Sequence, residues 1–167
     1  MKFLLSSVLL LSFVASNAIA CSFAPGYFTF EATPSKFQTK MDEGHIALLP
    51  APVASVKSIS RGKAAPGASC EDAGIIELII TWPHSPYGLE EVGFYFQSDN
   101  GFEPDLIFPL GPVTGEIKGN QASFMFVWLD GHPKHQKKLD FNVNVFAVNK
   151  GLQVGQPTTV NIKAKKG

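Results

Sequence analysis

The chain has 167 residues, 14 basic and 14 acidic side chains, and a formal net charge of zero. This balance argues against a nucleic-acid partner, because neutralising phosphates requires a clustered excess of Lys and Arg. Fourteen Phe, twelve Pro and fifteen Gly favour many strands joined by turns over a helical bundle. We therefore expect an all-β protein without a nucleic-acid ligand.

Residues 1–20 have the three-part layout of a secretory signal peptide. Lys2 provides the early positive charge, Phe3–Val14 is mostly apolar, and Ala18-Ile19-Ala20 resembles a cleavage site. The apolar run is too short to span a bilayer, and no later stretch approaches about 18 consecutive apolar residues. We expect a secreted or periplasmic protein without a transmembrane segment, whose mature chain begins at Cys21. Its 147 residues are enough for one domain with a hydrophobic core.

Two cysteines remain after the leader, Cys21 and Cys70. An oxidising compartment makes a disulfide between them the first expectation, and its loop of about 50 residues corresponds to roughly 4 kcal/mol of chain entropy. The alternative is a lipid anchor at Cys21, since bacterial lipoprotein signals place a small residue such as Ala20 directly before the modified cysteine. Against this, Ala18 stands where those signals usually have Leu. Both interpretations stay open.

Residues 21–49 form an N-terminal extension that is rich in aromatic side chains and contains one expected short strand, Tyr27–Glu31. Disordered segments are poor in aromatic residues, so we expect the extension to pack on the domain that follows. The alternative is an arm that seeks a partner. The aromatic residues concerned are Phe23, Tyr27, Phe28, Phe30 and Phe37.

From Pro50 onward the hydrophobic pattern becomes regular and predicts seven strands separated by turns, which is typical of a β-sandwich over residues 50–167. In Gly74–Trp82, alternation places Ile76, Leu78, Ile80 and Trp82 on one face, so these are predicted core residues. Prolines interrupt Leu106–Ile117, which we expect at the rim of a sheet. The seven predicted strands are Val53–Ile59, Gly74–Trp82, Val92–Gln97, Leu106–Ile117, Ala122–Leu129, Leu139–Asn149 and Pro157–Lys163.

The strand Leu139–Asn149 carries apolar residues on both faces. Phe141, Val143, Val145 and Ala147 share one face, and Phe146 and Val148 lie on the other. A free-standing sandwich would expose the second set to water, and an apolar stripe of that kind requires a cover. We expect the N-terminal extension to provide it.

Four segments in chain order resemble a fibronectin type III domain or a close immunoglobulin-like relative. The strongest is Phe141–Asn149 (FNVNVFAVN), followed by Lys150-Gly151 and then Gln156-Pro157-Thr158-Thr159-Val160. The others are Pro50–Val53, Trp82-Pro83, and Phe94 with Phe96 after Gly93. The resemblance covers residues 50–163 and implies a seven-stranded Greek-key sandwich. Because such folds host many functions, it implies no activity.

No familiar catalytic motif is present: the chain lacks G-x-S-x-G, H-E-x-x-H and a glycine-rich phosphate loop. We expect no catalytic residue and no cofactor. His132 and His135 beside Asp130 are weak candidates for a zinc or copper site. Lys134 and its neighbours would repel a cation, so a solvated basic loop is the preferred interpretation.

Two aromatic residues remain as candidate ligand contacts. Tyr87 lies in a predicted turn and Trp128 directly before a loop, where either ring could stack on a sugar. We expect a secreted or periplasmic, non-enzymatic interaction module that binds a protein or has a structural role in the cell envelope. The alternatives are a carbohydrate-binding module, with a polysaccharide partner, and a small envelope enzyme or metal carrier.

Overall fold

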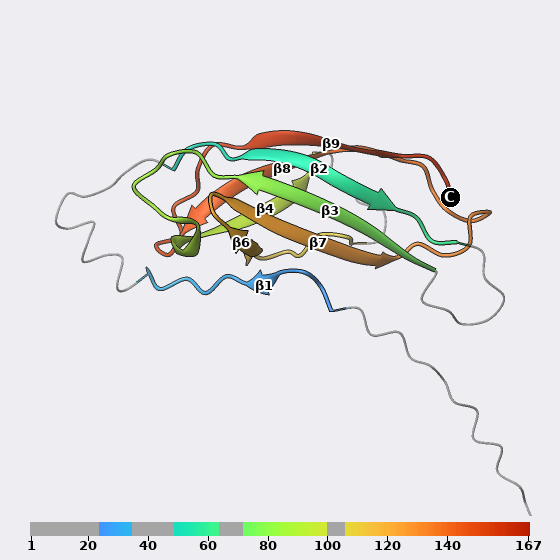
Figure 1. The fold of residues 1–167 in the computed structure, drawn as a ribbon, viewed down its shortest axis with the longest axis horizontal. Helices are drawn as coiled ribbons and strands as arrows, with labels where there is room; N and C mark the ends of the chain where they lie inside the picture. Colours follow the sequence, from blue (N-terminus) through green and yellow to red (C-terminus); the bar gives the residue numbers. More distant parts are fainter. Residues whose placement is uncertain (1–23, 35–48, 64–71, 100–105) are drawn as a thin grey trace, which may run out of the picture.

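The computed structural model describes residues 24–34, 49–63, 72–99 and 106–167. They form two antiparallel sheets, so the all-β prediction is confirmed. The five-stranded sheet has the order β1-β5-β4-β8-β9 and the four-stranded sheet the order β2-β3-β7-β6 (Figure 1). The strands are β1 Phe28–Thr29, β2 Val53–Ser60, β3 Ala73–Thr81, β4 Val92–Ser98, β5 Val113–Thr114, β6 Glu116–Lys118, β7 Gln121–Leu129, β8 Leu139–Asn149 and β9 Thr158–Ala164, with a short 3-10 helix, η2, at Leu89–Glu91.

The two sheets pack face to face because each long strand alternates apolar and polar positions. In β3, Ile76, Leu78 and Ile80 are fully buried, as predicted. Aromatic rings from the two sheets meet in the core, where Phe94 and Phe124 pack edge to face with centroids 5.8 Å apart. Trp82 directly follows β3 and is also buried, so its predicted core position is confirmed.

The segment predicted as one irregular strand, Leu106–Ile117, is divided between the two sheets. β5 pairs with β4 and β1, whereas β6 pairs with β7. The chain changes sheet at Gly115, where a Cβ atom would lie 2.3 Å from the carbonyl oxygen of Ser123. Of these two strands, β6 lies at the rim of its sheet as predicted, whereas β5 does not, because β1 pairs with its outer edge.

From Pro50 onward the described residues contain eight strands, so the prediction of seven is one too low. The additional strand comes from the split at Gly115, which hydrophobic alternation does not indicate because β5 has only two residues. In the N-terminal extension, β1 lies within the short strand expected at Tyr27–Glu31, so that prediction is confirmed.

Residues 24–34, hereafter the N-terminal strap, cross from one sheet to the other along one side of the molecule (Figure 1). Gly26 exchanges backbone hydrogen bonds with Met125 of β7 at 3.0 and 3.3 Å, and β1 then pairs with β5. Between them, Tyr27 packs on Phe126 with a centroid distance of 5.3 Å. The strap thus closes this side of the core, while β2 and β9 run together along the opposite side.

The strap also places an aromatic ring on the outer face of the five-stranded sheet. Phe30 is 7% exposed and lies over Gly93 of β4, where an added Cβ would come within 2.5 Å of the ring. Gly93 pairs with Val148, the outward residue of β8 that is fully buried. Residues 35–48 lie outside the described residues, so packing of the extension as a whole stays a prediction.

Among the described residues, no helix has the length and apolar character needed to cross a membrane.

Candidate functional site

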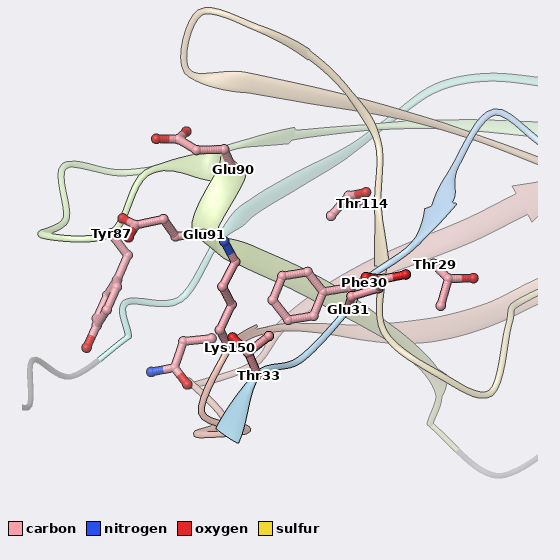
Figure 2. Close-up of a pocket in the computed structure, with 10 residues that line it drawn as sticks. Thr29, Phe30, Glu31, Thr33, Tyr87, Glu90, Glu91, Thr114 and Lys150 are labelled. Atoms are coloured by element: carbon pink, nitrogen blue, oxygen red, sulfur yellow. The ribbon is translucent and has the colours of Figure 1, made fainter. Parts of the chain in front are cut away.

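A cavity of about 590 Å³ lies where the strap meets the β3–β4 turn and the end of β8. Four stretches that are distant in sequence supply its walls, and Figure 2 shows their side chains around the opening. We call it the strap pocket. Its lining residues are Thr29, Phe30, Glu31, Thr33, Tyr87, Glu90, Glu91, Thr114, Asn149 and Lys150.

Hydrogen bonds of side chains hold the turn that carries Tyr87. The indole Nε1 of Trp82 donates to the carbonyl oxygen of Tyr87 at 2.8 Å, and the Tyr87 amide donates to Ser85 Oγ at 3.2 Å. The Gly88 amide then donates to the Glu91 carboxylate at 3.1 Å. Because Trp82 is held in the core, this wall of the strap pocket is anchored to the sandwich.

The end of β8 is equally well defined. Asn149 is fully buried, and its Oδ1 accepts hydrogen bonds from the amides of Gly151 and Gln153, each at 3.0 Å. Its Nδ2 donates to Gln153 Oε1 at 2.9 Å. These bonds hold a tight turn in which Leu152 adopts a φ of 64°, a left-handed conformation that costs a non-glycine residue energy. Asn149 therefore has a structural role, and Lys150 beside it is the group available to a ligand.

The strap is fixed to both neighbouring walls by its backbone. The Phe30 amide donates to the carbonyl of Pro112 at 3.0 Å, and the Thr33 amide donates to the carbonyl of Lys150 at 2.9 Å. Glu31 and Thr33 are thereby held on the side of the pocket opposite Tyr87.

The rim of the strap pocket carries three carboxylates and one ammonium group, from Glu31, Glu90, Glu91 and Lys150. In Figure 2 the Lys150 side chain rises between Glu91 and the ring of Phe30. None of the four charged groups forms a salt bridge with another described residue. Threonine hydroxyls and two aromatic rings complete a lining that can bind polar ligands but presents no nucleophile paired with a base.

The two residues predicted as ligand contacts, Tyr87 and Trp128, do not share a site. Tyr87 lines the strap pocket. Trp128 is 6% exposed, and Gly74 on the paired strand leaves room for its ring, since an added Cβ would lie 2.2 Å from Cζ2. Its Nε1 donates to Asp130 at 3.3 Å. Trp128 is thus a core residue in this structure, with little ring surface for a sugar.

His132 and His135 are exposed, and their ring centroids lie 6.2 Å apart. His132 Nδ1 accepts a hydrogen bond from the Lys134 amide at 3.1 Å. Both oxygens of Asp130 accept hydrogen bonds from Arg61. Asp130 could therefore bind a metal together with the two histidines only if its ion pair with Arg61 were broken. Among the described residues, no group of three or more His, Cys, Asp or Glu is arranged to bind a metal ion. Cys21 and Cys70 lie outside the described residues.

Sequence reasoning missed Glu31, Glu90, Glu91 and Lys150. The Glu90-Glu91 pair after a turn was a visible signal, but nothing in the sequence places the other two residues beside it. Comparisons of the chain with protein-family models, with curated proteins and with solved structures found no match.

Proposed function

We propose that this chain is a secreted or periplasmic, non-enzymatic binding module that holds a partner protein at the strap pocket. The observation that supports this is the pocket itself, a cavity of about 590 Å³ whose walls come from four separate stretches of chain and whose charged groups have no ionic partner among the described residues. Surface loops on a rigid scaffold are common positions for binding sites. The leader-like residues 1–20 support export.

We also propose that the domain is of the fibronectin type III or immunoglobulin kind. Strands β2, β3, β7 and β6 form one sheet, and β4, β8 and β9 lie consecutively in the other. In chain order this corresponds to the ABED and CFG sheets of an immunoglobulin-type sandwich, with β5 beside β4 as an additional strand. The strap and β1 lie outside that pattern.

Site-specific photo-crosslinking tests the binding function. A photoreactive residue at Thr33, in the strap pocket, is compared with one at Thr81, which lies on the four-stranded sheet. In envelope and culture-medium fractions we expect one adduct of defined mass at Thr33 and none at Thr81. The double charge reversal Glu31→Lys with Glu90→Lys should remove the adduct. Equal adducts at both positions, or none at Thr33, would contradict the proposal.

A further inference from the structure

The outer face of the five-stranded sheet carries a row of amide and hydroxyl side chains beside two aromatic rings. Alternation in β8 buries Val143 and Val145, so Asn142, Asn144 and Phe146 lie on the opposite, outer face. The register then places neighbours across from them: Tyr95 opposite Phe146, Gln97 opposite Asn144, Thr159 opposite Asn144, and Asn161 opposite Asn142. We call these seven residues the amide-aromatic face.

Hydrogen bonds between the side chains hold this face in one arrangement. Thr159 Oγ1 donates to Asn144 Oδ1 at 2.7 Å, and Asn161 Nδ2 donates to Asn142 Oδ1 at 2.9 Å. Asn144 Nδ2 also reaches Asp99 Oδ1 at 3.4 Å. A face that is ordered before binding loses less side-chain entropy when a ligand arrives.

Several polar groups of the face remain available to a ligand. The amide nitrogen of Asn142, the amide group of Gln97 and the hydroxyl group of Tyr95 have no hydrogen-bond partner in the part of the chain that the structure describes. These groups include both donors and acceptors. They lie on two neighbouring strands, β4 and β8, about 5 Å apart.

The two rings add an apolar platform next to these amides. Tyr95 and Phe146 stack with centroids 5.2 Å apart and an interplanar angle of 26°, and both are half-buried. Phe30 covers the adjoining position at Gly93, so the platform ends at the strap. Apolar rings and amide groups thus lie side by side on the outer face of the sheet.

The amide-aromatic face is rich in Asn, a residue type that is unfavourable in strands. Asn is depleted in β-strands, where Thr, Val or Tyr fit better, yet β8 and β9 place three Asn side chains on it: Asn142, Asn144 and Asn161. Exposure to water alone gives no reason for this choice, because Thr would be equally soluble and a better strand former. Residues that lower strand propensity are expected mainly at functional sites, so Asn at successive outward positions of β8 favours a binding surface.

Charge restricts the class of ligand. Asp140 at one end of the face is paired with Lys138 at 2.7 Å and Lys163 at 3.8 Å, so its charge is compensated. The seven residues of the amide-aromatic face are all uncharged. The carboxylate beside them, Asp99, accepts a hydrogen bond from Asn144, so a polyanion would meet no unpaired positive charge among the described residues of this face. A protein interface would bury a more apolar centre than this row of amides.

From these observations we infer that the amide-aromatic face binds an uncharged oligosaccharide. Sugar hydroxyl groups would pair with the amides of Asn142 and Gln97, and the apolar C–H side of a sugar ring would pack on Tyr95 and Phe146. None of the seven residues of this face lines the strap pocket, which it adjoins at Phe30, so binding at either site can be tested without the other.

Titration calorimetry of the full mature chain with cellohexaose, chitohexaose and maltohexaose tests the inference. We expect saturable binding of at least one of the three. Asn142→Thr and Gln97→Thr should each weaken that binding about fivefold, the effect of one lost hydrogen bond. Thr is a better strand former than Asn or Gln, but Asn142→Thr also removes the acceptor of the bond from Asn161. Thermal unfolding of both variants therefore checks that the fold is kept.

Two control variants test whether oligosaccharide binding depends on the amide-aromatic face alone. Ser123→Thr, on the outer face of the four-stranded sheet, and Lys150→Ala, in the strap pocket, should both bind as the wild type does. The inference is overturned if none of the three hexasaccharides binds saturably, or if Asn142→Thr and Gln97→Thr bind with unchanged affinity.

Discussion

Arg61 and Asp130 form a bidentate ion pair in the interior: Arg61 Nε donates to Oδ2 at 2.7 Å, and Nη2 donates to Oδ1 at 2.8 Å. The two side chains are only 7% and 4% exposed. Arg61 also donates to the carbonyls of Lys137 and Lys165, at 2.9 and 3.0 Å. The chain's one arginine therefore joins the segment after β2, the loop before β8 and the segment after β9.

Removing one partner of this pair leaves the other charge buried and unpaired. We expect Arg61→Met to lower the free energy of unfolding by about 3–5 kcal/mol, the usual cost of breaking a buried pair. Arg61→Lys keeps the charge but lacks the planar fork, so it should fall between Arg61→Met and the wild type. Urea denaturation measures all three, and an Arg61→Met variant as stable as the wild type would show that the pair contributes nothing.

Trp82→Ala should cost about 3–5 kcal/mol, because it removes a large buried ring that packs edge to face on Phe94 at 5.7 Å. Trp82→Phe is the matched control. It keeps an aromatic ring but loses the hydrogen bond from Nε1 to the Tyr87 carbonyl, worth about 1 kcal/mol. Thermal unfolding compares the two variants, and equal losses would mean that the ring contributes little beyond that bond.

Glu77 gives the stability of the four-stranded sheet a pH dependence. The hydrogen bond from Ser58 Oγ, at 2.7 Å, is the largest cause that holds the pKa of Glu77 below its usual value. Burial, the next largest, opposes it, and Lys57 at 3.4 Å lowers the pKa further. A carboxyl group whose pKa is lowered by folding stabilises the fold above its ordinary pKa, and this contribution is lost as the pH falls through the lowered value.

Ser58→Ala should therefore raise the pKa of Glu77 toward its usual value, which an NMR titration of the carboxyl carbon measures directly. The wild type should exceed the variant in free energy of unfolding at about pH 7, and this difference should become smaller as the pH is lowered to about 3. A Glu77 titration that Ser58→Ala leaves unchanged would contradict this assignment.

Gly93→Ala tests the contact between the strap and the outer face of β4. The new methyl group would lie 2.5 Å from Cγ of Phe30, so the ring must move away. We expect a loss of about 1–3 kcal/mol, the usual cost of overpacking, together with increased binding of a hydrophobic dye. Gly111→Ala is the control, because its Cβ meets no atom within 4 Å; similar dye binding by both variants would argue against the contact.

The two cysteines remain to be tested by chemistry. We expect the mature protein to resist alkylation at Cys21 and Cys70 without reductant and to gain two adducts after reduction, because the proposed export would place both cysteines in an oxidising compartment. Intact-mass measurement distinguishes the outcomes. Two free thiols, or the added mass of a diacylglycerol group at Cys21, would rule out the disulfide.

The long strands could be predicted from sequence because alternation is a local signal. Ile76, Leu78 and Ile80 needed no knowledge of the partner strands to be placed in the core. Phe146 and Val148 could likewise be recognised as outward apolar residues. Val148 is buried and its cross-strand partner Gly93 is covered by Phe30 of the extension, the segment expected to cover this face. Periodicity did not indicate that Phe30 provides the contact, or that Phe146 stacks on Tyr95, because both depend on residues far apart in the chain.

The missed features all depend on register and topology. Glu31 and Lys150 meet at one pocket because the strap turns toward the end of β8, and Tyr95 stacks on Phe146 because β4 pairs with β8. Nothing in the sequence pairs Arg61 with Asp130, which the sequence indicated only as a weak candidate metal ligand beside His132 and His135. A buried ion pair between residues 69 positions apart leaves no periodic pattern in the sequence.

The strap is synthesised first, yet its partners come late. Gly26 cannot pair until Met125 has been made, and β1 must wait for β5. Contacts of such long range raise the contact order and slow folding, and until they form Tyr27 and Phe30 are exposed to water on an incomplete chain. A truncation that stops before Met125 would therefore do more than remove the last strands. It would also release an aromatic segment at the opposite end of the chain, with the aggregation hazard that such a segment carries.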